Sequence, residues 1–411
     1  IAKLSAVIVL ANSHFGQELS IERITQEMLE DDKTYRLLAE GNTQNVFQFS
    51  SPGITRFIQD VRPKCIEDLI AINALYRPAT LDIGATEDYI RFRRGEVAPV
   101  YDYGCYEATK NTFGIMCYQE QFMSIAHTLG GFDLGKTDLL RKAIGKKKAD
   151  LMATLKADFI AGAVRNGCPD YEAEEIWHKI EVAGKYSFNR SHAAAYALTA
   201  YCGAWLKANY PSAFYTVALQ WADDKEIPPL MAEMERCSSA KIVPPDINRS
   251  GTEFFTDYAT DEIFWSLTRI KQVGVKTVEH IVTERDRGGA YTGIENFIHR
   301  IFRYKLKKYS YWDDPDNPEE AVKVPVNARH VKHMVLAGCF DRVENVGAVT
   351  ERCALLERAA RELGFSLSEK DFSLDMRERH FFWSQQQIAV SGIGSIDYRR
   401  IFDNSEARRQ V

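Results

Sequence analysis

The alternation of apolar and polar positions predicts a mainly helical chain. Residues 1–30 fit an amphipathic helix, a break at Gly16 and a second helical stretch. The pair Asp31-Asp32 then indicates a new helix start, because acidic side chains are favoured in the first turn. Helical spacing of apolar residues continues in most segments to about residue 225. We therefore expect a large multi-helix domain over residues 1–225.

The most regular helix is predicted for the Ala-rich run from Ser191 to Asn209. Ala has the highest helix propensity, and a Ser side chain is a good acceptor for the unpaired backbone N–H groups of a first turn. Ser191 is therefore the expected N-cap. Pro211 cannot continue a helix and is expected to end the run.

The pattern changes after the acidic, Pro-containing stretch 223–229, where we expect a domain boundary. Residues 226–365 are predicted to form a smaller domain with short β-strands, and residues 366–411 a linker or the start of a further region. The smaller domain has β-prone runs at 241–243 and 262–265 and helical spacing of apolar residues at 270–298 and 326–363. Its acidic, Pro-containing stretch 311–325 indicates a loop or an insertion.

Composition narrows the class of protein. The chain has 411 residues, 45% hydrophobic and 27% charged, which is ordinary for a globular protein of two or three domains. No apolar run is long enough to span a membrane, and no signal peptide is recognisable. Eight Cys without C-x-x-C spacing favour free thiols in a reducing cytoplasm over a zinc site. Because the chain opens on Ile1, we expect it to be a piece of a longer protein.

The net charge of −5 does not by itself indicate nucleic-acid binding, but basic residues are clustered. Lys136 to Lys148 holds six basic residues and one acid. On a helix, Arg141 and Lys142 lie one turn from Lys146, an arrangement that suits a polyphosphate. The alternative is a solvated basic face, and charge spacing alone favours that alternative.

A second cluster combines cations with rings. His192 and Tyr196 are four residues apart and share one helix face, with Arg190 just before them. A cationic helix start, an imidazole and an aromatic ring could hold the phosphates and base of a nucleotide. A core Tyr and a satisfied His on an Ala-packed helix explain the same spacing.

A third pattern lies at residues 270–282, where two helical stretches flank the apolar-Gly-apolar turn Val273-Gly274-Val275. Such a hairpin presents backbone N–H groups that bind a DNA phosphate without reading sequence. The basic-aromatic run 300–308, which includes Arg303 and Lys305, strengthens this interpretation. An ordinary helix–turn–helix connection is the alternative.

Taken in order, several long motifs resemble the bacterial DNA polymerase III alpha subunit, the C-family replicative polymerase. The resemblance runs from about residue 1 to 300 and resumes at 327–341. The motifs are Thr34–Phe49, Asp68–Pro78, Phe113–Gln121, Asp138–Lys148, Phe188–Pro211, Pro244–Asn248 and Leu336–Asp341.

The resemblance implies roles for individual residues. Arg141, Lys142 and Lys146 would face the incoming triphosphate, and Arg77 would lie near the active site. Arg190, His192 and Tyr196 would line the nucleotide pocket. Val273, Gly274, Val275 and Lys276, with Arg303 and Lys305, would contact the DNA backbone.

The chain departs from the family pattern at several points. The family binds Mg²⁺ through three palm Asp residues, which we expect upstream of Ile1, so no catalytic or metal-ligating residue is assigned here. Lys142 replaces a common Arg, which keeps the charge but loses bidentate geometry. Gln272 replaces the usual Gly of the hairpin. Glu369–Phe372 is a poor match to a sliding-clamp motif.

We therefore expect a mainly α chain: a multi-helix fingers domain followed by a small helix-hairpin-helix domain with short β-strands. The implied function is DNA-directed DNA synthesis during replication, with a palm outside this chain that holds Mg²⁺. The implied partners are primer-template DNA, deoxynucleoside triphosphates, the palm and thumb, and a sliding clamp with other replisome subunits, and no membrane. The alternatives are a non-catalytic DNA-binding or split-enzyme half, and an error-prone translesion paralogue. A helix-hairpin-helix repair nuclease is disfavoured by the upstream motifs.

Overall fold

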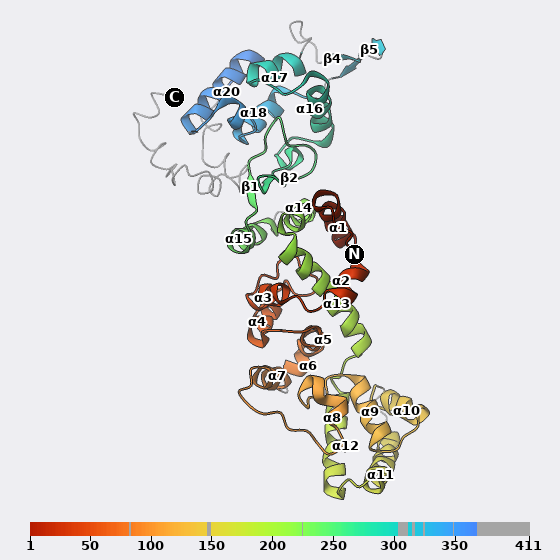
Figure 1. Ribbon diagram of the computed structural model, residues 1–411. Coiled ribbons are helices and arrows are strands. Elements are labelled where there is room, and N and C mark those ends of the chain that lie inside the picture. Colours follow the sequence, from red (N-terminus) through yellow and green to blue (C-terminus); the bar gives the residue numbers. More distant parts are fainter. Residues whose placement is uncertain are drawn as a thin grey trace. The chain divides into compact units, whose positions relative to one another are not determined.

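The computed structural model (Figure 1) describes residues 1–81, 84–145, 149–223, 225–302, 311–314, 317–323, 325–347 and 349–367. The chain divides into two compact units, Ile1–Phe214 and Tyr215–Val411. Both are dominated by helices, which confirms the predicted mainly α class. No helix among the described residues is long and apolar enough to cross a lipid bilayer. The domain boundaries expected at residues 225 and 365 stay predictions, since compactness alone does not define an independently folding domain.

The regular elements described in the first unit are helices, and one isolated bridge joins Tyr118 and Phe188. The helices are α1 (Ala2–Phe15), α2 (Ile21–Glu27), α3 (Asp32–Ala39), α4 (Pro52–Val61), α5 (Ile66–Leu75), α6 (Pro78–Leu81), α7 (Ala85–Arg93), α8 (Tyr106–Thr109), the 3₁₀ turn η1 (Lys110–Thr112), α9 (Gln119–Thr128), α10 (Leu134–Gly145), α11 (Ala149–Arg165), α12 (Asp170–Gly184) and α13 (Arg190–Asn209). The predicted break at Gly16 and the helix start at Asp31 are confirmed.

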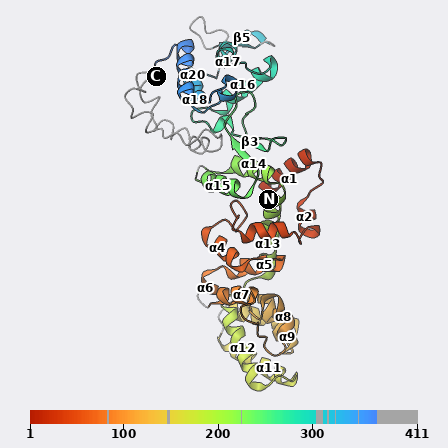
Figure 2. The same ribbon diagram turned by 60° about the vertical axis from the view of Figure 1, so that its left-hand side comes forward.

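Helix α13 is the central element of the first half of this unit. It packs against α1, α2, α3 and α5, and it runs beside α3 and α5 in both Figure 1 and Figure 2. Its buried side includes Ala193, Ala197 and Ala200, whose small side chains let neighbouring helices approach closely. The site residues Arg190, His192 and Tyr196 therefore stand on a helix that is fixed on several sides.

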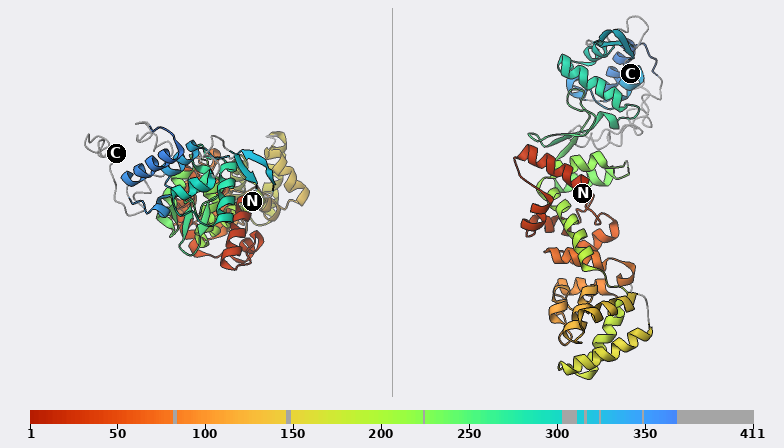
Figure 3. Two further views of the ribbon diagram at one scale, coloured as in Figure 1. Left: turned by 90° about the horizontal axis from the view of Figure 1, so that it is seen from above. Right: turned by 90° about the vertical axis from the view of Figure 1, so that its right-hand side faces the viewer.

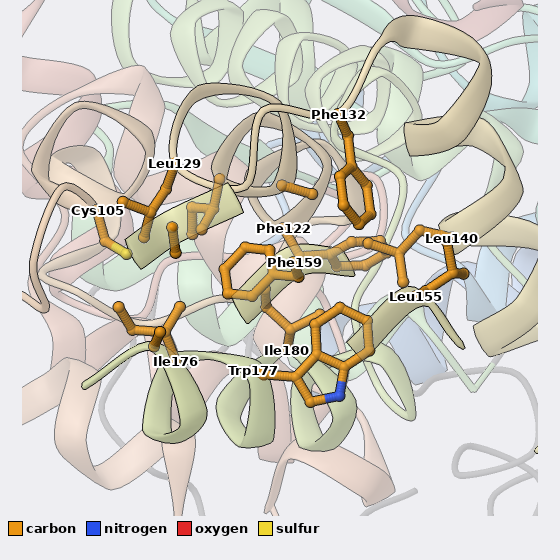
Figure 4. Packing of buried hydrophobic residues seen from close by; sticks show 14 of the residues in the cluster. Cys105, Phe122, Leu129, Phe132, Leu140, Leu155, Phe159, Ile176, Trp177 and Ile180 are labelled. Atoms are coloured by element: carbon orange, nitrogen blue, oxygen red, sulfur yellow. The ribbon is translucent and has the colours of Figure 1, made fainter. Parts of the chain in front are cut away.

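A separate hydrophobic core joins α8 to α12 (Figure 4). Phe159 lies at its centre, 5.4 Å from Trp177 and 6.3 Å from Phe132 between ring centroids. Helix α11 approaches the end of α9 so closely that a Cβ on Gly162 would lie 1.9 Å from the Gly130 carbonyl oxygen. This core holds α10, which carries the predicted triphosphate residues.

The second unit begins within α14 (Pro211–Trp221) and combines a small sheet with helices, drawn from green to blue in Figure 3. The sheet has the order β1-β3-β2, with β1 parallel and β2 antiparallel to β3. The elements are α15 (Ile227–Cys237), β1 (Lys241–Val243), β2 (Phe255–Asp257), β3 (Glu262–Phe264), the 3₁₀ turn η2 (Leu267–Arg269), α16 (Val275–Gly288), α17 (Ile294–Ile301), β4 (Tyr311–Asp314), β5 (Asn317–Lys323), α18 (Ala328–Leu336), α19 (Asp341–Glu344) and α20 (Val349–Leu363).

The predicted strands at 241–243 and 262–265 are confirmed, whereas the loop predicted for 311–325 is wrong. That segment forms the antiparallel pair β4–β5, with Tyr311 opposite Lys323 and Trp312 opposite Val322. The acidic residues and Pro318 suggested a loop, but the aromatic and β-branched residues at the two outer ends favour strands. The predicted linker at 366–411 lies almost wholly outside the described residues.

Candidate nucleotide and DNA-backbone sites

The start of α13 is organised by Asn189, not by the predicted Ser191. The Asn189 side chain accepts a hydrogen bond from the His192 backbone N–H at 2.8 Å, which makes Asn189 the N-cap and places Ser191 inside the first turn. Asn and Ser are about equally good N-caps, so the local sequence does not separate them. Asn189 is held in place because its Nδ2 donates to Glu120 Oε1 at 3.1 Å.

Arg190 is fixed by two acidic side chains. Its Nη2 lies 2.6 Å from Glu67 Oε1 on α5, and its backbone N–H donates to Glu120 Oε2 at 3.0 Å. Burial opposes the charged form, but the hydrogen bond to Glu67 and the charges of Glu67 and Glu120 together outweigh burial and raise the pKa of Arg190. Arg190 thus remains a cation that is about two-fifths exposed and already has a carboxylate partner.

Aromatic rings follow one another along the same helix face. The His192 and Tyr196 ring centroids are 4.2 Å apart, and the Phe188 and His192 centroids are 5.4 Å apart. His192 is exposed and Tyr196 is half-buried, so neither is a core residue. The contact between His192 and Tyr196 confirms the prediction that they share one helix face. Their role in nucleotide binding stays a prediction.

Arg77 joins this cluster from the end of α5. Its guanidinium lies 4.5 Å above the Phe188 ring, and its Nη2 donates to the Tyr186 carbonyl at 2.7 Å. A further hydrogen bond runs from Nε to the Ala74 carbonyl at 2.7 Å. Burial lowers the pKa of Arg77 from its usual value. Arg77 therefore braces the segment before α13 as well as bringing a positive charge beside it.

The predicted triphosphate residues lie on α10 and form a different group. Arg141 Nη2 and Lys142 Nζ contact the two oxygens of Asp138, at 2.7 and 2.6 Å. Hydrogen bonds from Lys142 and Arg141 hold the pKa of the Asp138 carboxyl below its usual value. No interaction within the described residues joins Arg141 or Lys142 to the α13 cluster. Lys146 lies outside the described residues.

Three acidic partners, Asp138, Glu67 and Glu120, were not predicted from the sequence. Asp138 stands three and four residues before Arg141 and Lys142, a spacing that places oppositely charged side chains together on a helix, so a signal was present. Glu67 gives no such signal, because 123 positions separate it from Arg190 and only the packing of α13 on α5 brings them together.

The hairpin at Val273-Gly274-Val275 begins with a shorter element than predicted. A 3₁₀ turn, Leu267–Arg269, precedes it in place of a helical stretch. The segment cannot continue as a helix because Ile270 is extended and Gln272 has a φ of 71°. The side chain of Arg269 also fixes the segment by donating from Nη2 to the carbonyls of Gln220 and Ala222, at 2.8 and 2.9 Å.

The hairpin presents a row of free backbone donors. Val273 is buried and anchors the turn, while Gly274, Val275 and Lys276 are exposed at the start of α16. No described residue accepts a hydrogen bond from the backbone N–H of these three exposed residues. Unpaired N–H groups at a helix N-terminus bind anions, and the helix dipole adds to the attraction. The geometry suits a phosphate oxygen.

Arg300, at the start of the predicted basic run, has an internal role and does not face DNA. It is buried on α17, where its Nη2 donates to the Glu284 carbonyl at 2.8 Å and its Nε to Glu284 Oε1 at 3.2 Å. Its Nη1 donates to the Gly289 carbonyl at 2.9 Å, and its guanidinium lies 4.3 Å above the Tyr291 ring. Arg303 and Lys305 lie outside the described residues.

Comparison with known proteins shows which family the chain resembles. The profile described as "Bacterial DNA polymerase III alpha subunit finger domain" matches residues 2–167, and the profile "Helix-hairpin-helix motif" matches residues 239–311. Along the chain, a finger-domain match is thus followed by a helix-hairpin-helix match. The chain belongs to the bacterial DNA polymerase III alpha subunit family.

Relatives that carry the name DNA polymerase III subunit alpha match across both units. The protein of Aquifex aeolicus is 39% identical over 282 residues, which is 68% of this chain and 24% of the relative. The corresponding values are 35%, 79% and 25% for Thermus aquaticus, and 36%, 77% and 26% for Pseudomonas aeruginosa. The chain thus spans about a quarter of the length of the curated relatives it matches.

Proposed function

We propose that this chain supplies nucleotide and DNA-backbone contacts to a DNA-directed DNA polymerase of the polymerase III alpha type. The proposal is supported by the profiles of a finger domain and a helix-hairpin-helix motif, which match residues 2–167 and 239–311. A second support is that the chain carries two sites suited to phosphate. The first is the cation and ring cluster at the start of α13. The second is the row of free backbone N–H groups at the start of α16.

Each predicted residue has a role in this proposal. Arg141, Lys142 and Lys146 face the triphosphate of the incoming deoxynucleotide, and Arg77 braces the pocket that Arg190, His192 and Tyr196 line. The hairpin residues Val273, Gly274, Val275 and Lys276, with Arg303 and Lys305, hold the backbone of the primer-template duplex. Cations and preorganised N–H groups suit these roles because negative charge moves along the phosphates during nucleotidyl transfer.

The reaction also requires a metal, for which we propose Mg²⁺ held by palm carboxylates outside these 411 residues. Among the described residues, no group of three or more His, Cys, Asp or Glu side chains could hold a metal ion. Bound metal would lower the charge on the phosphates and activate the primer hydroxyl. The proposed partners are the palm and thumb, a sliding clamp and other replisome subunits, in the cytoplasm.

Primer extension tests the proposal directly. The 411-residue chain alone, with Mg²⁺ and all four deoxynucleotides, should give no product above background, and a chain joined to a family palm should extend primers. Robust extension by the chain alone would show that its carboxylates were overlooked. Binding to DNA without extension, even with the palm restored, would favour the non-catalytic alternative. Efficient extension past damaged template bases would favour the translesion alternative.

A further inference from the structure

The loop between α3 and α4 places Phe47 against the nucleotide cluster. Phe47 contacts Tyr196 with ring centroids 5.1 Å apart and ring planes tilted by 49°, while 44% of the residue stays exposed. Through Tyr196 it continues the series of contacts that runs to His192, Phe188 and the Arg77 guanidinium. Phe47 is thus the free end of an aromatic column, and Arg77 is its cationic end.

The backbone around Phe47 is held in a costly conformation. Asn45 and Gln48 have φ values of 58° and 62°, in the left-handed region, which Asn adopts readily but which carries a steric cost for Gln48. Such residues persist only where the surroundings determine the backbone, and they gather at functional sites. The neighbours Val46 and Phe49 are buried, which turns Phe47 outward.

Several long-range contacts fix this loop. The buried Lys207 of α13 donates from Nζ to the carbonyls of Asn42 and Gln44, at 3.0 and 2.6 Å. Lys3 Nζ of α1 donates to Asn45 Oδ1 at 3.0 Å. A lysine ammonium is buried here to hold two backbone carbonyls, although its burial opposes the charge. The loop is therefore preorganised to present one exposed ring.

We propose that Phe47 is a stacking platform for an unpaired nucleobase. An exposed ring at the end of an aromatic column offers a flat face on which an unpaired base can stack, and Lys3, which contacts Asn45 in the same loop, brings a positive charge to it. Either a single-stranded DNA base or the base of a free deoxynucleoside triphosphate could occupy it, and the same π-face would serve both. The inference rests on the proposed function only in taking the α13 cluster as a nucleotide site.

Fluorescence anisotropy of short labelled oligonucleotides tests the single-stranded source. Phe47→Ala should weaken binding of a mixed-sequence oligonucleotide about tenfold, because stacking on one aromatic side chain contributes on this scale. Phe47→Tyr should bind like the parent. Phe15 is the matched control, since it is 42% exposed and its ring centroid lies 5.2 Å from that of Tyr210 in a similarly tilted contact outside this column. Phe15→Ala should change little.

An abasic oligonucleotide separates stacking from structural damage. If Phe47 meets a base, the parent and Phe47→Ala should bind abasic DNA equally, and the salt dependence of both should agree because no phosphate contact is lost. Quenching of 2-aminopurine deoxynucleoside triphosphate provides the second arm. A Phe47 effect confined to that arm assigns the platform to the free nucleotide.

Two results would overturn the inference: unchanged affinity of Phe47→Ala in both arms, or an equal loss on normal and abasic oligonucleotides. Neither outcome depends on duplex binding by the hairpin or on primer extension, which test the proposed function separately. A chain that fails to extend primers but shows the base-dependent Phe47 effect would keep the platform and lose the polymerase role.

Discussion

The two candidate phosphate sites meet negative charge by different means. In the first unit the cations are side chains that already have carboxylate partners, as Arg190 does with Glu67 and Arg141 and Lys142 do with Asp138. In the second unit the donors are backbone N–H groups of Gly274, Val275 and Lys276, which no described residue pairs. A ligand must displace an acid at the first site and only water at the second.

This difference explains why the net charge of the chain does not predict whether it binds DNA. A hairpin of backbone donors binds phosphate without adding any positive side chain, so a chain with a net charge of −5 can still hold DNA. Cations that are paired with a carboxylate attract distant anions only weakly, because the carboxylate cancels most of their charge. The ion pairs nevertheless fix the positions of these cations, which suits a ligand with several negative charges. We therefore expect the second site to govern duplex affinity and the first to govern nucleotide use.

The largest effect is expected for Arg300, a buried cation that binds Glu284 on α16, the helix whose first residues carry the free backbone donors. Arg300→Ala should lower the free energy of unfolding of the second unit by about 3–5 kcal/mol, because it leaves Glu284 buried beside unpaired carbonyls. Arg287→Ala removes the more exposed partner of Glu284 and should cost less than about 1 kcal/mol. Urea denaturation of both variants measures the two values. Similar values would show that the burial of Arg300 is not essential.

The next effect concerns the paired cations of α10. In an enzyme with its palm restored, Arg141→Ala or Lys142→Ala should reduce kcat/KM for a correct nucleotide by a factor that corresponds to about 2–4 kcal/mol. Duplex affinity should change little. A solvated basic face predicts less than about 1 kcal/mol. Steady-state kinetics beside a duplex-binding assay separates the two. If both variants extend primers like the parent, the nucleotide site is misplaced.

Replacing Asp138 tests whether a competing carboxylate distinguishes the α10 site from the hairpin. Asp138→Asn should leave Arg141 and Lys142 without their shared carboxylate and so lower KM for the nucleotide, by about threefold if one exposed ion pair is lost. The hairpin has no equivalent acid, so duplex affinity should not respond. A rise in KM would indicate that Asp138 positions the two cations for the triphosphate, and does not merely compete with it.

The smallest effect is expected at the hairpin turn. Gln272 has a φ of 71°, where glycine avoids the steric cost of a side chain. Gln272→Gly should stabilise the second unit by about 0.5 kcal/mol, because relief in the folded state exceeds the added freedom of the unfolded chain. Gln272→Ala keeps the cost and is the control. Equal stability of the two variants would show that the turn is not strained.

The sequence predicted those features that depend on residues close together along the chain. The helix start at Asp31, the strand at 241–243 and the shared face of His192 and Tyr196 follow from capping, strand propensity and helical spacing. Sequence could not place Phe47 against Tyr196 or Glu67 against Arg190, because the packing of α13 decides both. The basic run 300–308 was interpreted as a DNA-binding segment from its charge, but charge alone does not reveal that Arg300 is buried.

The measurement closest to the central claim removes one backbone donor from the hairpin without removing any charge. Val275 is the first residue of α16, a position that accepts Pro, and Gly274 before it is extended, as a residue before Pro must be. Ile21 is the first residue of α2 in the first unit, after the extended Ser20, and Ile21→Pro is the matched control. Affinity for two unrelated duplexes over a range of salt should be equal between sequences in each protein and should fall with salt. Val275→Pro should weaken both duplexes about tenfold, as expected for one hydrogen bond to a charged group, while Ile21→Pro should match the parent. Unchanged affinity of Val275→Pro would contradict DNA binding by the hairpin backbone.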